Sequence, residues 1–211
     1  EVHGVDVVPK FTGLDARIDA IFGPDHAIPP VHLQLVDPYA TLPYEDGTFD
    51  AAFAWSVFEH VGDPGRSIRE LHRVLKPGGA FFLIINPMYL SPMGGHLWNV
   101  LDEPWIHLRL SREELFDRVR KAILKADVEE GRTDIWQGKT VEEYRETLLG
   151  CLDSLNMVTI RQLKDHLRYA GFTIVAEEMR QTLPHEPPAD LLARYGRDDL
   201  LTDEIRLLLK R

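Results

Sequence analysis

The chain has 211 residues and a formal net charge of −10 at pH 7, because 34 Asp and Glu outnumber 24 Lys and Arg. The length suits a single domain with a substantial core, and the acidic balance argues against nonspecific binding to a nucleic-acid backbone. No apolar run approaches the roughly 20 residues that span a bilayer. The single cysteine, Cys151, excludes an intramolecular disulfide and is interpreted as a buried thiol in a reducing compartment. We therefore expect a cytoplasmic protein without membrane or nucleic-acid partners.

The first part of the chain alternates apolar strands with connections. Strands are predicted at 2–8, 32–36 and 49–55, with an amphipathic turn at 14–22 between the first two. The third strand is almost wholly apolar, which is typical of strands buried on both faces.

A helix with a clear start and stop follows the third strand. Asp63 and Pro64 form an N-cap and first-turn pair, and apolar residues recur at helical spacing until the turn at 76–79 stops the helix. A further strand is predicted at 80–85. This order is typical of an α/β protein with a parallel sheet and helices on its faces.

The pattern changes over residues 88–157, which we interpret as an insertion that forms a substrate lid within one domain spanning 1–211. A loop rich in Gly, Pro, Trp and His precedes helices predicted at 111–129 and 140–155. The sheet pattern then resumes. It consists of a helix at 159–170 ending at Gly171, a strand at 172–177, and a last strand at 204–209 after a proline-rich, helical connection.

Two aspartates lie where the first two predicted strands end. Ligands of an open parallel sheet bind at the carboxyl ends of its strands. There the Asp6 carboxylate suits the two hydroxyls of a ribose, and the Asp37 carboxylate suits an adenine amino group. Either acid alone is more often a turn-forming or helix-capping residue, so the hypothesis depends on the pair.

Three segments occur in an order and spacing that is more diagnostic than any one of them. They read LPYEDGTFD at 42–50, SVFEHV at 56–61 and ELHRVLKPGG at 70–79. Together they resemble the S-adenosylmethionine-dependent methyltransferases of the Rossmann-like class, type-11-like. The resemblance covers residues 2–87 and resumes at 163–177 and 200–210, which look like the sixth strand and the antiparallel seventh strand of that family.

The resemblance implies a doubly wound, mostly parallel sheet with an antiparallel last strand, and S-adenosylmethionine as cofactor. Asp6 matches the acid that holds the ribose, Asp37 matches the strand exit beside the adenine, and Leu42 would lie near the adenine ring. At the exit of the strand at 49–55, backbone groups would face the methionine part and the transferring methyl. The implied cofactor-binding positions are Asp6, Asp37, Pro38, Leu42, Trp55 and Ser56.

The first strand of the family and its Gly-rich loop have no counterpart in this sequence. Gly78-Gly79 is a helix stop and Gly94-Gly95 lies in the insertion, so neither replaces that loop. The absent strand would lie centrally, between the strands at 2–8 and 49–55, and without it the sheet would be split, with backbone groups left unpaired. We therefore expect an upstream segment in the natural protein.

Methyl transfer is an in-line attack on a sulfonium methyl, so alignment and desolvation supply most of the acceleration. An oxygen nucleophile also needs a proton acceptor, and His60, just after the strand at 49–55, is the catalytic candidate; the alternative is a histidine that only structures its turn. Rings of the inserted loop suit an acceptor pocket, and the alternative is a loop anchored by buried tryptophans. The predicted substrate-binding residues are His96, Trp98, Trp105 and His107.

No metal site is predicted. The nearby histidines and acids are spaced in a way that fits no compact zinc pattern; the histidines are His60, His96 and His107.

The predicted function is S-adenosylmethionine-dependent methyl transfer to a small-molecule acceptor, and the histidines favour an oxygen acceptor. One alternative is a noncatalytic interaction module derived from this fold. Another is a nicotinamide-dependent oxidoreductase, because Asp6 would serve that ribose equally well.

Overall fold

A computed structural model describes residues 1–7, 13–23, 31–98, 100–122, 140–181 and 183–211. The chain divides into two compact units, residues 1–43 and residues 44–211. Within the described parts, no helix combines the length and the apolar character that crossing a bilayer requires.

The first unit is built on two parallel strands, β1 (Val2–Asp6) and β2 (Val31–Leu35), which pair in register from Val2 with Val31 to Asp6 with Leu35. Helix α1 (Leu14–Phe22) lies between them in the chain. Both strands and the helical turn were predicted to within a few residues. Residue 8, the predicted end of the first strand, lies outside the described residues.

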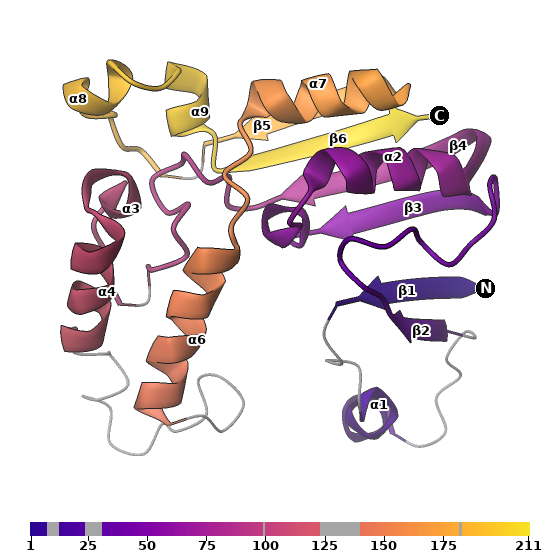
Figure 1. Cartoon of the computed structure of the whole chain (residues 1–211), viewed down its shortest axis with the longest axis horizontal. Coiled ribbons are helices and arrows are strands. Elements are labelled where there is room, and N and C mark those ends of the chain that lie inside the picture. The colour runs from indigo at the N-terminus through magenta and orange to yellow at the C-terminus, as the bar shows by residue number, and fades with distance from the viewer. Residues whose placement is uncertain (8–12, 24–30, 99, 123–139, 182) are drawn as a thin grey trace. The chain divides into compact units, whose positions relative to one another are not determined.

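The second unit contains a four-stranded sheet (Figure 1). Its strands are β3 (Phe49–Trp55), β4 (Leu75–Ile85), β5 (Thr173–Arg180) and β6 (Glu204–Lys210), in the order β3-β4-β6-β5. β3 and β4 are parallel, and β6 runs antiparallel to both of its neighbours. The expected α/β fold with an antiparallel last strand is confirmed.

The described strands form two separate sheets, as expected for a split between the strands at 2–8 and 49–55. Among them, β1 is hydrogen-bonded to β2 alone and β3 to β4 alone. Each of these two strands therefore has one edge that no described strand pairs with.

Helix α2 (Pro64–Val74) begins and ends as its sequence predicts. The side chain of Asp63 accepts a hydrogen bond from the backbone N–H of Arg66 at 2.8 Å, which satisfies one N–H that the helix leaves unpaired. The turn at 76–79 lies within β4, which begins as soon as the helix ends. Helix α7 (Ile160–Ala170) likewise ends at Gly171, whose φ of 99° few other residues adopt.

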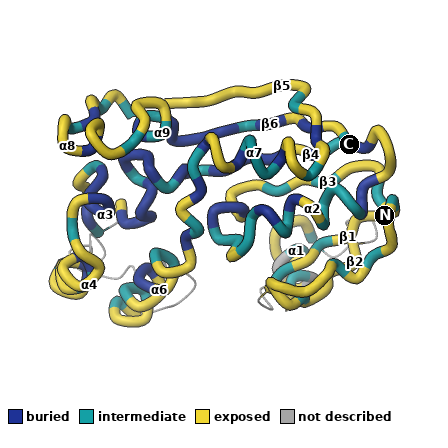
Figure 2. The backbone as a smooth tube through the Cα atoms, turned by 45° about the horizontal axis from the view of Figure 1, so that its top comes forward, coloured by how far each residue is buried: buried dark blue, intermediate teal, exposed yellow. Residues whose placement is uncertain are grey.

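The main core lies between the sheet and the helices α2 and α7, which lie side by side on one face of it (Figure 1). Ala52 and Ala54 of β3 pack on this core. Because side chains alternate along a strand, Phe53 and Trp55 face the other way and are 74% and 66% exposed. The interpretation of this strand as buried on both faces is therefore wrong. Figure 2 shows β5 as an exposed edge beside the largely buried β6.

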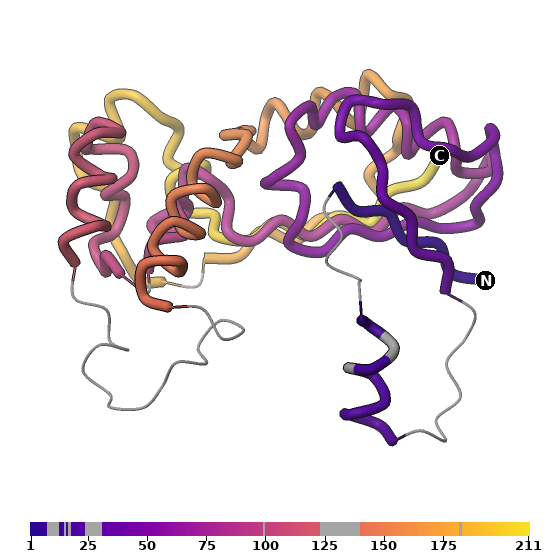
Figure 3. Tube along the Cα trace, turned by 60° about the horizontal axis from the view of Figure 1, so that its bottom comes forward, coloured from indigo at the N-terminus to yellow at the C-terminus, as the bar shows by residue number. Residues whose placement is uncertain are grey.

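The segment 88–157 contains helices α3 (Ile106–Arg109), α4 (Arg112–Lys121) and α6 (Val141–Ser154). Helices α4 and α6 run alongside each other (Figure 3) and share a small core. This core consists of Leu97, Leu101, Ile106, Leu115, Val119, Leu148 and Leu149. The helix predicted at 111–129 ends early, because Ala122 is extended, and residues 123–139 lie outside the described residues. Helices α8 (Ala189–Leu192) and α9 (Arg197–Leu201) occupy the predicted connection.

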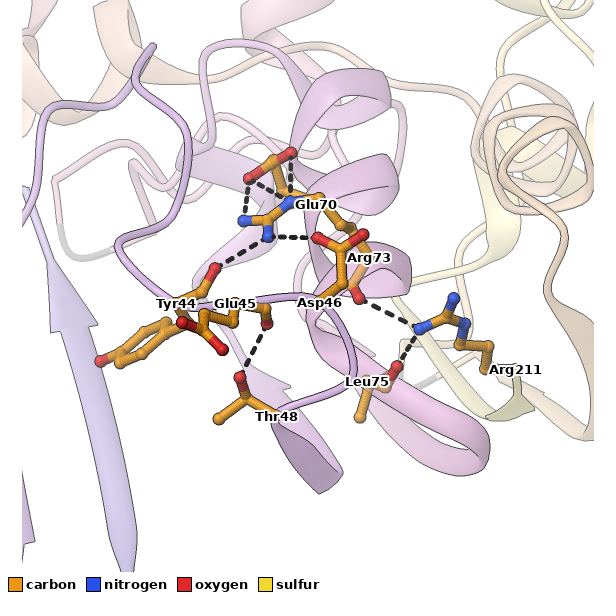
Figure 4. Close-up of polar contacts among 8 residues, drawn as sticks. All are labelled: Tyr44, Glu45, Asp46, Thr48, Glu70, Arg73, Leu75 and Arg211. Atoms are coloured by element: carbon orange, nitrogen blue, oxygen red, sulfur yellow. Dashed lines mark hydrogen bonds and ion pairs between the residues drawn. The ribbon is translucent and has the colours of Figure 1, made fainter.

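Arg73 of α2 ties the turn before β3 to the helix (Figure 4). Its Nη1 donates to the backbone carbonyl of Tyr44 at 2.8 Å and to Asp46 Oδ1 at 2.9 Å, and its Nη2 donates to Glu70 Oε2 at 2.8 Å. Arg211 in turn donates to the carbonyl of Arg73 at 3.0 Å. Two of the three motif segments are therefore held together by one guanidinium.

Candidate functional site

The two predicted cofactor acids lie at the carboxyl ends of the neighbouring strands β1 and β2. Asp6 ends β1, and its backbone carbonyl accepts from Val36 at 2.9 Å, which continues the pairing beyond β2. Asp37 follows, and its Oδ1 accepts from the backbone N–H of Tyr39 at 2.7 Å. Asp37 thus forms a turn, as the alternative interpretation predicted, and its cofactor role stays a prediction. Leu42, partly buried, lies next to the end of this unit at Pro43.

In the second unit, Trp55 and Ser56 lie at the carboxyl end of β3. The backbone N–H of Ser56 donates to the carbonyl of Ile84 at 3.1 Å. Its φ of 47° is unusual for a residue other than glycine, and such strained positions cluster at functional sites. The predicted backbone role of Ser56 is compatible with this geometry.

The short helix Phe58–His60 follows, and it carries the buried Glu59. Burial raises the pKa of this carboxyl to about 7, and its Oε2 lacks a hydrogen-bond partner among the described residues. Asn156 donates from Nδ2 to the carbonyls of Phe58 and Val61 at 2.6 and 3.0 Å. The end of the inserted segment is therefore fastened to the turn that carries His60.

The contacts of Ser154 favour one tautomer of His60. Ser154 Oγ donates to the carbonyl of Cys151 at 2.7 Å, and the same Oγ lies 2.8 Å from His60 Nδ1. A serine hydroxyl has one proton, so Oγ accepts from an Nδ1–H of His60. In the neutral ring the lone pair is then on Nε2.

His96 lies beside His60, with ring centroids 5.1 Å apart. It is only 8% exposed, its φ is 58°, and its Nδ1 lies 3.3 Å from Cys151 Sγ. Burial, with the nearby His60 and His107, lowers the pKa of His96 to about 4, so its ring is neutral near pH 7. Its Nε2 is buried without a hydrogen-bond partner in the described parts of the chain.

The loop that carries His96 needs its two glycines. A Cβ on Gly94 would collide with the backbone carbonyl of Tyr89, and a Cβ on Gly95 would lie 2.7 Å from the Cβ of His107. The GG pair therefore allows close backbone packing, which is a structural role.

Trp105 and His107 anchor the loop from within. Trp105 is 2% exposed, and its Nε1 donates to the carbonyl of Leu200 at 3.2 Å. His107 is also buried, and its Nε2 lies 2.7 Å from the carbonyl of Tyr89. Burial lowers the pKa of His107 to about 4. These contacts match the alternative of a loop anchored by buried rings.

Trp98 differs from these two residues because it borders a cavity. The cavity has a volume of about 160 Å³ and is lined by Asn86, Pro87, Met93, Trp98, Leu183 and Asp203. The Trp98 side chain is 40% exposed, and its ring lies 5.3 Å from that of His96. Of the four predicted acceptor residues, Trp98 thus lines the cavity and His96 adjoins it through Trp98.

Sequence reasoning missed the part played by Cys151. The cysteine is half-buried, and it lies beside His96 instead of within the apolar core of its helix. Ser154, one helical turn further on, belongs to the same group. No local pattern marks either residue, because their partners are about 55 and 94 positions away in the chain.

Comparisons of sequence point to one family. Residues 1–83 match the model of a family described as "Methyltransferase domain". An uncharacterized methyltransferase of Mycobacterium sp. (strain KMS) is 43% identical over 56 residues, which are 26% of this chain and 22% of that protein. The chain spans about a fifth of the length of the curated relatives it first matches.

Solved structures agree on the fold. An S-adenosylmethionine-dependent methyltransferase from Mesorhizobium loti has a TM-score of 0.51 at 20% identity, over 100% of this chain and 80% of its own. The cyclase SpnF has a TM-score of 0.52 at 20% identity, over 100% of this chain and 66% of its own. The predicted resemblance is thus confirmed: the sequence match lies over residues 1–83, and the fold is that of S-adenosylmethionine-dependent methyltransferases.

Proposed function

We propose that the protein transfers a methyl group from S-adenosylmethionine to a small-molecule acceptor bound in the cavity beside Trp98. The match of residues 1–83 to a methyltransferase domain carries this proposal. Similarity of fold alone would not support it, because a cyclase shares the fold.

S-adenosylmethionine is the cofactor that the family and the fold imply; it supplies a methyl group on a positively charged sulfur. The donor set of the first unit fits the nucleoside part, since Asp6 and Asp37 place carboxylates at the ends of adjacent parallel strands. Carboxylates accept strong hydrogen bonds from hydroxyl and amino groups. Pro38 and Leu42 of the same unit would supply apolar contacts to the base. For the backbone of Trp55 and Ser56 in the second unit, the role toward the methionine part rests on the resemblance alone.

We infer an oxygen acceptor from the histidines at this end of the second unit. A hydroxyl nucleophile must lose a proton, and His60 holds a lone pair on Nε2 because its Nδ1–H is bound to Ser154. Ser154 would thus act as a positioning residue. Trp98 would offer an aromatic surface for the acceptor, while Asn86 and Asp203 supply polar groups in the same cavity.

The first test is calorimetric titration of the full-length protein with S-adenosylmethionine. We expect micromolar binding that Asp6→Ala weakens by about 1–3 kcal/mol, because charge-assisted hydrogen bonds are lost. Asp19→Ala, at an exposed position of α1, is the matched control. Absence of binding by the full-length protein would favour a noncatalytic module, and nicotinamide bound on purification would favour an oxidoreductase.

The second test follows the isotopically labelled methyl group of the cofactor into small alcohols, phenols and amines. Transfer to hydroxyl compounds, lost in His60→Gln, would support the oxygen acceptor. Transfer to amines alone would contradict it while leaving methyl transfer itself intact.

A further inference from the structure

His60, His96 and Cys151 come from three separate parts of the second unit. His60 follows β3, His96 lies in the loop after β4, and Cys151 lies on α6. A potential ligand atom of each residue lies within 4.8 Å of those of the other two. Two imidazoles and a thiol form a set that binds zinc and related divalent cations.

We propose that His60, His96 and Cys151 bind a zinc-type divalent cation. Two protein nitrogens and one thiolate leave the fourth position of a tetrahedral ion open, as in zinc sites that bind water or a substrate. The proposal concerns cation binding and stands whether or not the protein transfers methyl groups.

The distances suit a tetrahedral ion after small side-chain movements. With Zn–S of about 2.3 Å and Zn–N of about 2.0 Å, sulfur and nitrogen ligands lie about 3.5 Å apart. His96 Nδ1 already lies 3.3 Å from Cys151 Sγ. His60 then has to approach by at most about 1.5 Å to complete the set.

The surroundings of the cluster resemble the supporting shell of a metal site. A histidine ligand commonly donates its other ring N–H to a nearby oxygen, which fixes the tautomer. His60 does so, since its Nδ1–H is bound to Ser154 Oγ, and Ser154 is held by the carbonyl of Cys151.

A plain hydrogen bond between the Cys151 thiol and His96 is the competing explanation. The hydrogen bond keeps the proton on the thiol, whereas metal binding breaks the S–H bond and releases its proton to solvent. Metal affinity should therefore fall as the pH is lowered. Coordination by His60 would also use the lone pair that the proposed proton acceptor needs, so one ring cannot serve both roles at once.

Titration of the reduced protein with Co²⁺ tests the proposal. Cys151 is the single cysteine of the sequence, so a sulfur-to-cobalt charge-transfer band can arise only there. We expect this band to saturate at one equivalent, with visible absorption typical of tetrahedral cobalt, and Zn²⁺ to displace the cobalt.

Variants then identify the ligands. Cys151→Ser should abolish the band, and His60→Gln and His96→Gln should each weaken binding at least about 10-fold. Ser154→Ala should weaken it about 10-fold through the supporting shell. The matched control is the double change His3→Gln and His32→Gln, which removes an exposed group formed with Glu1. This control should leave the band unchanged.

Wild-type protein that shows no charge-transfer band would overturn the proposal without any variant. A band that survives both His60→Gln and His96→Gln at unchanged affinity would also overturn it, because Cys151 would then bind cobalt by itself. Circular dichroism of the metal-free variants separates lost ligands from lost folding.

Discussion

Asp46 and Arg73 form an ion pair of 2.9 Å between Oδ1 and Nη1, although 27 positions separate them in the chain. The same guanidinium binds Glu70 and the carbonyl of Tyr44 (Figure 4). Two motif segments, at 42–50 and 70–79, therefore meet at Arg73. In the second unit, the contacts of Arg73 with Tyr44 and Asp46 therefore join these two segments.

Replacing Arg73 tests this contact. Arg73→Lys keeps the charge but loses the forked hydrogen bonds to Glu70, so we expect the free energy of unfolding to fall by about 1–2 kcal/mol. Urea denaturation measures this change in the free energy of unfolding. Lys76→Met is the control, because its ion pair with Asp50 is exposed and should contribute less than about 1 kcal/mol. Equal effects of the two changes would contradict a special role for Arg73.

Alanine substitutions at two glycines of the second unit should change the stability of the protein in opposite directions. Gly94→Ala forces a Cβ against the carbonyl of Tyr89, so it should destabilise the protein by more than about 2 kcal/mol. Gly150→Ala adds a Cβ in open space on the exposed face of α6 and should stabilise it by about 0.5–1 kcal/mol. Thermal denaturation compares them. A neutral Gly94→Ala would mean that the loop is not closely packed.

Burial of His107 makes stability depend on pH. Its pKa is lowered from 6.5 to about 4, so between these values the unfolded chain takes up a proton that the folded protein excludes. The contribution of the neutral His107 ring to the free energy of unfolding is fully present above pH 6.5. It is lost as the pH falls towards 4, by up to about 3 kcal/mol. Urea unfolding at several pH values should show this slope, reduced in His107→Gln. An unchanged slope in that variant would assign the effect to other groups.

Trp98 gives a prediction for the proposed acceptor cavity. Trp98→Ala should raise the KM for the acceptor about 10-fold, because a large aromatic contact is lost, while affinity for S-adenosylmethionine stays unchanged. Tyr169→Ala, at an exposed ring on α7, is the control. Steady-state kinetics with any identified acceptor would decide. Weakened cofactor binding with an unchanged KM would move Trp98 out of the acceptor site.

Much of the fold was predictable because its signals are local. The cap at Asp63, the stop at Gly171 and the apolar run at 49–55 each depend on a few neighbouring residues, and all three elements are found. Exposure was less predictable. Phe53 and Trp55 look like core residues in the sequence, but a strand is covered only where other elements pack on it, and α2 and α7 pack on the opposite face.

The sequence by itself determined the order of the strands and of the longer helices, the acids where β1 ends and just after β2, and the resemblance that residues 1–83 carry. Only the tertiary structure decided which inserted rings are anchors and which line a cavity, because burial depends on packing with distant segments such as that of Leu200. It also decided that His60, His96 and Cys151 meet. Ligands drawn from separate segments leave no spacing in the sequence, since the fold and not the chain sets their distance.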